Sequence, residues 1–137
     1  MKAKYYIIIL FLISLVCGCI RGLVSVEVKE GSCDYSLEDH TNPVSFSVQN
    51  DKIVINHVAT YVCGGMELKA DINLTGNQIF VNEWLQLYEL AGGEYGATSC
   101  FCPRNNTLTV GPVARGTYDV VLIYGGEEIK RFIINII

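Results

Sequence analysis

The chain has 137 residues, which is the length of one domain once a targeting segment is removed. It carries 10 basic and 14 acidic residues, and two of the basic residues lie in an N-terminal leader. The remainder therefore has 8 basic against 14 acidic residues, a net charge of −6. This balance, without a basic patch, excludes nucleic acid as an expected partner and argues against anionic lipid beyond a membrane anchor.

The leader has the layout of a secretory signal. Lys2 and Lys4 precede an apolar run over residues 5–16 that only Ser14 interrupts. This run is shorter than the roughly 20 residues that a bilayer span needs, and Arg21 prevents its extension. The sequence therefore predicts export rather than a transmembrane helix.

Residues 16–19, Val-Cys-Gly-Cys, resemble the lipoprotein signal box of bacteria and some archaea. The resemblance implies cleavage after Gly18, so that residues 1–18 are a lipoprotein signal peptide and residues 19–137 form the mature domain. It also implies a lipid thioether on Cys19, while Cys17 leaves with the signal. Two acyl chains would hold the protein stably at the cell membrane, on its extracytoplasmic side. An ordinary secretory signal is the alternative.

From residue 23 onward the chain has the signals of β-strands. Runs of alternating or β-branched residues predict strands with one face in the core and one face in water. They cover residues 23–29, 44–49, 52–62, 66–74, 78–90, 106–110, 117–124 and 127–137. Turn residues separate several of them, as in Thr-Gly-Asn and Tyr-Gly-Gly-Glu. A helical turn competes only over residues 82–93. We expect an all-β fold: a single antiparallel two-sheet sandwich, immunoglobulin-like, with about eight strands and disulfide bonds. A closed barrel is the alternative fold.

The residues predict neither a catalytic site nor a cofactor or metal site. The two histidines, His40 and His57, belong to no Ser/His/Asp arrangement, and no G-x-S-x-G motif occurs. His57 shares the strand parity of Ile53 and Ile55, which places it in the core or on a sheet face. Trp84 is predicted to pack in the core, with ligand stacking as the alternative.

A glycine-rich stretch is the candidate binding loop. Gly92, Gly93 and Gly96 give it backbone freedom, and Tyr95 is expected to be exposed. A long connection between strands is the alternative. Two glycosylation sequons begin at Asn73 and Asn105, at predicted turns, although such tripeptides also arise by chance.

Four cysteines remain after lipidation: Cys33, Cys63, Cys100 and Cys102. Outside the membrane an even set of thiols predicts disulfides, with a zinc site as the runner-up. On a strand, Cys100 and Cys102 would have Cα atoms about 6.6 Å apart on one face, which strains a direct bond. Each is therefore expected to pair elsewhere. We favour Cys63–Cys100 with Cys33–Cys102, and the opposite pairing stays open.

The last three-fifths of the chain resemble secreted, lipoprotein-like β-sandwich domains of unknown function. Their pattern is a cysteine and a short hairpin, then C-x-C-P, an apolar strand and G-x-Y-x-V. The matching positions in this chain are Cys63, Cys100, Cys102, Pro103, Gly116, Tyr118 and Val120. The resemblance implies no activity. We expect a non-catalytic binding or structural role, with a surface protein or a glycan as ligand.

Two other functions stay open. Residues 41–44, Thr-Asn-Pro-Val, and the glycine-rich loop resemble parts of the immunoglobulin-like inhibitors of papain-type cysteine proteases. That resemblance implies protease inhibition, although the "R-P-W" loop of those inhibitors is missing. An uncharacterised enzyme is the third class, supported only by the unassigned loop.

Overall fold

The computed structural model describes residues 24–37, 43–62, 65–87 and 100–137. Eight strands occupy most of this part of the chain, and each overlaps one of the ranges that the alternation predicts. The strands are β1 (Ser25–Lys29), β2 (Val44–Gln49), β3 (Lys52–Val62), β4 (Met66–Thr75), β5 (Gln78–Leu87), β6 (Phe101–Gly111), β7 (Gly116–Tyr124) and β8 (Glu127–Ile136). β6 begins five residues earlier than predicted, and residues 82–87 continue β5 rather than forming a helical turn.

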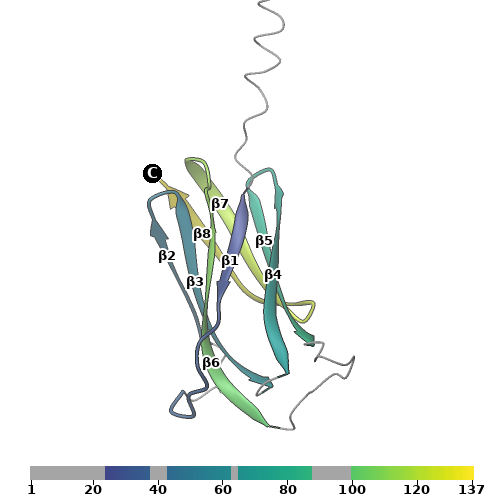
Figure 1. Ribbon diagram of the computed structural model, residues 1–137. Helices are drawn as coiled ribbons and strands as arrows, with labels where there is room; N and C mark the ends of the chain where they lie inside the picture. The colour runs from purple at the N-terminus through teal and green to yellow at the C-terminus, as the bar shows by residue number, and fades with distance from the viewer. Residues whose placement is uncertain (1–23, 38–42, 63–64, 88–99) are drawn as a thin grey trace, which may run out of the picture.

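The strands form two four-stranded sheets that pack face to face (Figure 1). One sheet has the order β1-β6-β3-β2 and the other has the order β4-β5-β7-β8. Side chains from both sheets meet in one apolar cluster, as in a sandwich. The prediction of an all-β fold with two sheets is therefore confirmed.

The prediction that all strand pairs are antiparallel is wrong at one place. β5 and β7 are neighbours and run parallel, with Ile79 beside Val120 and Val81 beside Leu122. Parallel neighbours need a crossover connection. Here β6 makes that crossover in the opposite sheet, so the chain re-enters the second sheet in the direction that β5 had.

The apolar core follows the predicted alternation. Ile53 and Ile55 of β3, with Leu108 and Val110 of β6, face the side chains of β5, β7 and β8 across the sandwich, and these four are fully buried. The edge strand β2 contributes less. Its Phe46 remains 44% exposed while its ring stacks on Phe132 of β8, with ring centroids 4.1 Å apart.

The two ends of the sandwich differ, and we call them the near pole and the far pole. The near pole is the end where β1 begins; it carries the β2–β3 and β4–β5 turns and the β6–β7 connection (Figure 1). Asn50 and Gly76 adopt positive φ there, at 57° and 60°, as tight turns require. The far pole is the end where β1 and β3 finish and where β7 turns into β8.

Candidate functional site

A group of polar side chains lies between the sheets toward the far pole. On β3 the inward positions pass from Ile53 and Ile55 to His57, and on β6 they pass from Leu108 to Asn106. The register pairs His57 with Asn106, so both strands change from apolar to polar at the same level. β5 does the same at Glu83. We call His57, Glu83, Arg104 and Asn106, with Glu30 beside them, the interior polar cluster.

His57 and Glu83 form the most buried contact of this cluster. The Nδ1 atom of His57 lies 2.7 Å from Oε2 of Glu83, and both side chains are 0% exposed. The two residues come from opposite sheets, so this contact links the sheets. The Tyr61 hydroxyl lies 3.4 Å from the same nitrogen.

The aromatic ring of Tyr124 closes one side of the His57–Glu83 pair. Its centroid is 5.9 Å from that of His57 and 5.5 Å from that of Tyr61, both edge-to-face. Partial burial, and secondarily the negative charge of Glu83, raise the pKa of the Tyr124 hydroxyl above its usual value. Tyr124 therefore stays neutral in the pH range in which most proteins work.

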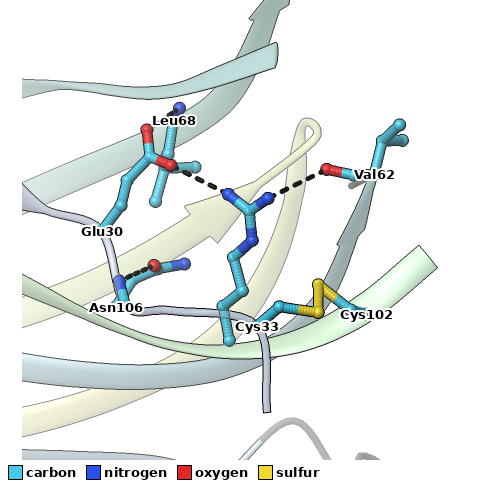
Figure 2. Close-up of polar contacts among 8 residues, drawn as sticks. Glu30, Cys33, Val62, Leu68, Cys102 and Asn106 are labelled. Carbon is cyan, nitrogen blue, oxygen red and sulfur yellow. Dashed lines mark hydrogen bonds and ion pairs between the residues drawn. A yellow bond between two sulfur atoms is a disulfide. The ribbon is translucent and has the colours of Figure 1, made fainter. Parts of the chain in front are cut away.

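Glu30 and Arg104 join the two sheets at a second place (Figure 2). Nη1 of Arg104 donates to Oε2 of Glu30 at 3.0 Å, and its Nη2 donates to the carbonyl oxygen of Val62 at 3.3 Å. Oε1 of Glu30 accepts from the backbone amide of Leu68 on β4 at 2.7 Å. One carboxylate thus connects β6 to an edge strand of the other sheet.

The segment after β1 is fixed to β6 by a disulfide and by backbone contacts. Cys33 is bonded to Cys102 (Figure 2). The amide of Asp34 donates to the carbonyl of Pro103 at 3.0 Å. The amide of Gly31 donates to Oδ1 of Asn106 at 2.9 Å. A Cβ on Gly31 would lie 2.3 Å from the backbone oxygen of Asn105, so only glycine allows this approach.

Asp34 stabilises the turn that leaves this segment. The amide and the hydroxyl of Ser36 both donate to its Oδ1, at 2.9 and 2.6 Å. These hydrogen bonds lower the pKa of the Asp34 carboxyl below its usual value. The turn therefore keeps an ionised carboxylate over a wide pH range.

Four buried polar atoms of the cluster have no hydrogen-bond partner within the described ranges: Nε2 of His57, Oε1 of Glu83, Nε of Arg104 and Nδ2 of Asn106. Buried groups of this kind are the usual hydrogen-bonding positions of internal water. The cluster can cross-link the two sheets. A substrate has no direct access to side chains that are 0% exposed.

The structure brings together two of the four cysteines expected in disulfides, Cys33 and Cys102, in the pairing that we favoured. Cys100 is also disulfide-bonded, which removes the zinc alternative for these three cysteines. Cys63 lies outside the described residues. So do Cys19 and the candidate loop residues Gly92, Gly93, Tyr95 and Gly96.

Both sequons lie in strands rather than in the turns where we predicted them. Asn73 is exposed near the end of the edge strand β4, and Asn105 is exposed in the middle of β6. Asn105 also lines an open hollow of about 300 Å³ on the outer face of its sheet. The predicted turn begins one residue after Thr75, because β4 continues through the sequon.

The prediction that Trp84 packs in the core is wrong. Trp84 is 39% exposed and has the opposite parity on β5 to the buried residues Val81 and Glu83, so it lies on the outer sheet face. Tyr118, at the centre of the G-x-Y-x-V segment, is buried at 8% exposure.

The sequence predicted His57 in the core or on a sheet face, and the structure places it in the core, but its partners were not predicted. Glu83 has the parity of Ile79 and Val81, and Arg104 and Asn106 have the parity of Leu108 and Val110. This shared parity with buried apolar residues was the signal that could have placed the three side chains in the interior. A charged residue in an alternating strand is usually on the solvent side, which is why the signal was overlooked.

Among the described residues, no group of three or more His, Cys, Asp or Glu side chains is placed to hold a metal ion. No helix in this part of the chain is long and apolar enough to cross a membrane. Comparison with protein-family models, with curated proteins and with solved structures found no match for this chain.

Proposed function

We propose that this protein is an exported lipoprotein, anchored to the cell membrane through Cys19, whose sandwich has a non-catalytic binding or structural role. The leader and its Val-Cys-Gly-Cys box carry the anchor. The packed interior supports the non-catalytic role, because His57 and Glu83, the pair closest to an acid–base arrangement, have no exposed surface.

The anchor is tested by membrane partition of two variants expressed in a lipoprotein-processing host. Cys19→Ser removes the proposed lipid attachment and should move the protein to the soluble fraction. Cys17→Ser is the matched control and should stay in the membrane, because Cys17 leaves with the signal. A Cys19→Ser protein that partitions with membranes as fully as the control contradicts the anchor.

The far pole is the proposed binding end. β5 finishes and β6 begins there, with Val62 paired to Phe101 and Met66 paired to Leu87. The Cys33–Cys102 bond and the Glu30–Arg104 contact fix the segment after β1 to β6 at this end, and Glu30 also accepts from the amide of Leu68 on β4 of the other sheet. Rigid strand ends that carry loops are a common basis for recognition. The glycine-rich segment around Tyr95 is the stretch that we assign to ligand contact.

The ligand is a surface protein or a glycan, and capture from native membranes tests this. Purified wild-type protein should retain a specific component, and Tyr95→Ala should retain less of it. Ile133→Ala is the control, since Ile133 is 73% exposed on β8, outside the proposed contact segment. Equal capture by the two variants contradicts a role for the loop.

We also propose that the sandwich is immunoglobulin-like. Its two aligned layers and the buried tyrosine of the G-x-Y-x-V segment support this relationship. The parallel β5–β7 pair and the division into four and four strands depart from the constant-type arrangement of four and three.

Protease inhibition and enzymatic activity are the two alternative functions. Inhibition of papain at equimolar concentration would favour the first. Turnover of chromogenic esters, peptides or glycosides would favour the second, and the binding proposal expects neither result.

A further inference from the structure

Four strands lie at the edges of the two sheets, and three of them have features that discourage pairing with another chain. The edges are β1 and β2 in one sheet and β4 and β8 in the other (Figure 1). β1 contains Glu27 and Lys29, and β8 has four charged side chains within residues 127–131. β4 is also charged, and the carboxylate of Glu30 accepts from its edge amide at Leu68. Charged side chains and covered backbone groups commonly protect an edge from another strand.

β2 has none of these protective features. Its sequence, Val-Ser-Phe-Ser-Val-Gln, contains no charged residue and no proline, and its register with β3 is continuous. Phe46 and Val48 have the parity that points toward the other sheet, yet they are 44% and 39% exposed. Within the described residues, β2 is therefore the one edge strand that is uncharged and whose inward apolar side chains remain exposed.

The free backbone groups of β2 belong to its apolar residues. The amide of Val58 donates to the carbonyl of Pro43 at 3.1 Å, one position beyond the paired residues of β2 and β3. Hydrogen-bonded pairs alternate along an antiparallel ladder, so the odd-numbered residues of β2 bond to β3. The N–H and C=O groups of Val44, Phe46 and Val48 then point away from β3, on the side where no described strand pairs with β2. Such a row is complementary to another extended strand.

The sequence of β2 is complementary to an antiparallel copy of itself. Residues 44–48, Val-Ser-Phe-Ser-Val, read the same in both directions about Phe46. An antiparallel copy centred there places Phe46 opposite the partner's Phe46 and Val44 opposite the partner's Val48. These are the residues whose backbone groups are free, so each such pair exchanges two hydrogen bonds. Aromatic and β-branched side chains meet on one face and serines on the other, and such cross-strand pairs stabilise a sheet.

The same two-fold symmetry brings no like charges together in the second layer. Phe132 of β8 stacks on Phe46 with ring centroids 4.1 Å apart, so the symmetry axis through Phe46 also passes close to Phe132. On β8 the charged side chains precede Phe132, and the residues that follow it are uncharged. Two copies related by this axis place the charged residues 127–131 of one nearest to the uncharged residues 133–136 of the other.

We propose that this protein forms a two-fold symmetric dimer in which the β2 strands of two copies pair antiparallel about Phe46. The two four-stranded sheets β1-β6-β3-β2 then join into one continuous sheet of eight strands. Each copy offers a single β2 edge, so the association is closed at two copies. The dimer does not depend on the proposed lipid anchor.

Sedimentation velocity of the whole Cys19→Ser chain over a concentration series tests the dimer. We expect a concentration-dependent shift from monomer to dimer. Ser45→Lys with Ser47→Lys puts like charges opposite one another across the axis and should raise the dissociation constant at least about tenfold. Ser45→Lys with Ser47→Glu is the matched control, because opposite charges then face one another, and it should bind at least as tightly as the parent. Both serines are exposed, and circular dichroism should show the same fold in both variants.

Disulfide cross-linking tests the register. A mixture of the Ser45→Cys and Ser47→Cys proteins should form a covalent dimer on mild oxidation, because these positions face each other with Cα atoms about 4.5 Å apart. Either protein alone should stay uncross-linked, since its substituted positions then lie diagonally, about 7–8 Å apart. Peptide mapping should locate the bond between positions 45 and 47.

Three results would overturn the dimer: a parent chain that stays monomeric at every concentration, a dimer that the two charge variants affect equally, and cross-linking as efficient in either single variant as in the mixture. The Cys19→Ser chain has no site for the proposed lipid. A failure of the dimer therefore leaves the proposed lipoprotein function untouched, and a failure of the anchor leaves the dimer intact.

Discussion

His57 and Glu83 are ionisable side chains at positions where neighbouring residues of the same strands are isoleucine and valine. Burying such groups is unfavourable unless each has a partner, and the 2.7 Å contact between the sheets supplies one. Each of the two side chains is therefore tolerated in the core only because the other is its partner.

Replacing one member of this pair should destabilise the fold strongly. Glu83→Leu in the unlipidated Cys19→Ser chain should lower the free energy of unfolding by roughly 3–5 kcal/mol, because His57 stays buried without its partner. Glu67→Leu is the control, since Glu67 forms a half-exposed ion pair with Lys69 and should cost about 1 kcal/mol or less. Urea unfolding measures both, and equal losses would contradict a structural role for the pair.

Tyr124 should titrate later than an ordinary tyrosine. Its pKa is raised in the folded state, so the stability that it contributes is complete below the unfolded pKa, about 10, and is lost as the pH rises through the folded pKa. Absorbance titration of the folded protein should lose one late-titrating tyrosine in Tyr124→Phe. A loss confined to the ordinary tyrosine range would contradict the raised pKa.

Single residues also mark the limit of sequence reasoning in this chain. The parity of His57 with Ile53 and Ile55 predicted a place in the core or on a sheet face, and the structure puts it in the core. Glu83 was missed because periodicity gives the side of the strand but not the partner across the sandwich. That partner depends on the register between sheets, which no local pattern encodes.

At the scale of elements, residues 31–34, which follow β1, are held by contacts to β6. The Cys33–Cys102 bond closes a loop with a sequence separation of 69, and the amide of Asp34 bonds to Pro103. Constraining so long a loop removes conformational entropy from the unfolded chain.

Removing this disulfide should lower stability substantially. The double variant Cys33→Ala with Cys102→Ala should lose about 4 kcal/mol under non-reducing conditions, by the chain-entropy model. Urea unfolding of the unlipidated chain measures the loss. Peptide mapping should show the Cys33–Cys102 linkage in the parent protein; a bond between Cys100 and Cys102 instead would be incompatible with this account.

Gly31 should tolerate no side chain. Gly31→Ala places a methyl group 2.3 Å from the backbone oxygen of Asn105, and the shift required should cost about 1–3 kcal/mol. The exposed neighbour provides the control, since Ser32→Ala should change stability by no more than about 0.5 kcal/mol. Thermal unfolding of the two variants compares them, and a neutral Gly31→Ala would refute the close approach to β6.

The strands themselves were predictable because period-two alternation is a local property of the chain. The parallel pairing of β5 with β7 was not, since it depends on β6 crossing to the other sheet. β6 was also predicted too short: Arg104, Asn105 and Asn106 have no apolar alternation, yet β3 provides hydrogen-bonding partners for this stretch.

At the scale of the whole molecule, the two poles divide the proposed roles between them. The near pole has the start of β1 and the tight turns at Asn50 and Gly76, whereas the far pole has the disulfide and lies closer to the interior polar cluster. A domain tethered before β1 through the proposed anchor would present the far pole to partners outside the cell.

The measurement that tests this account most directly is mass spectrometry of the N-terminal peptide of protein isolated from native membranes. The account predicts that the mature chain begins at Cys19 and that this residue carries a diacylglycerol thioether. A membrane-bound chain that begins at another residue, or that has an unmodified Cys19, would contradict it.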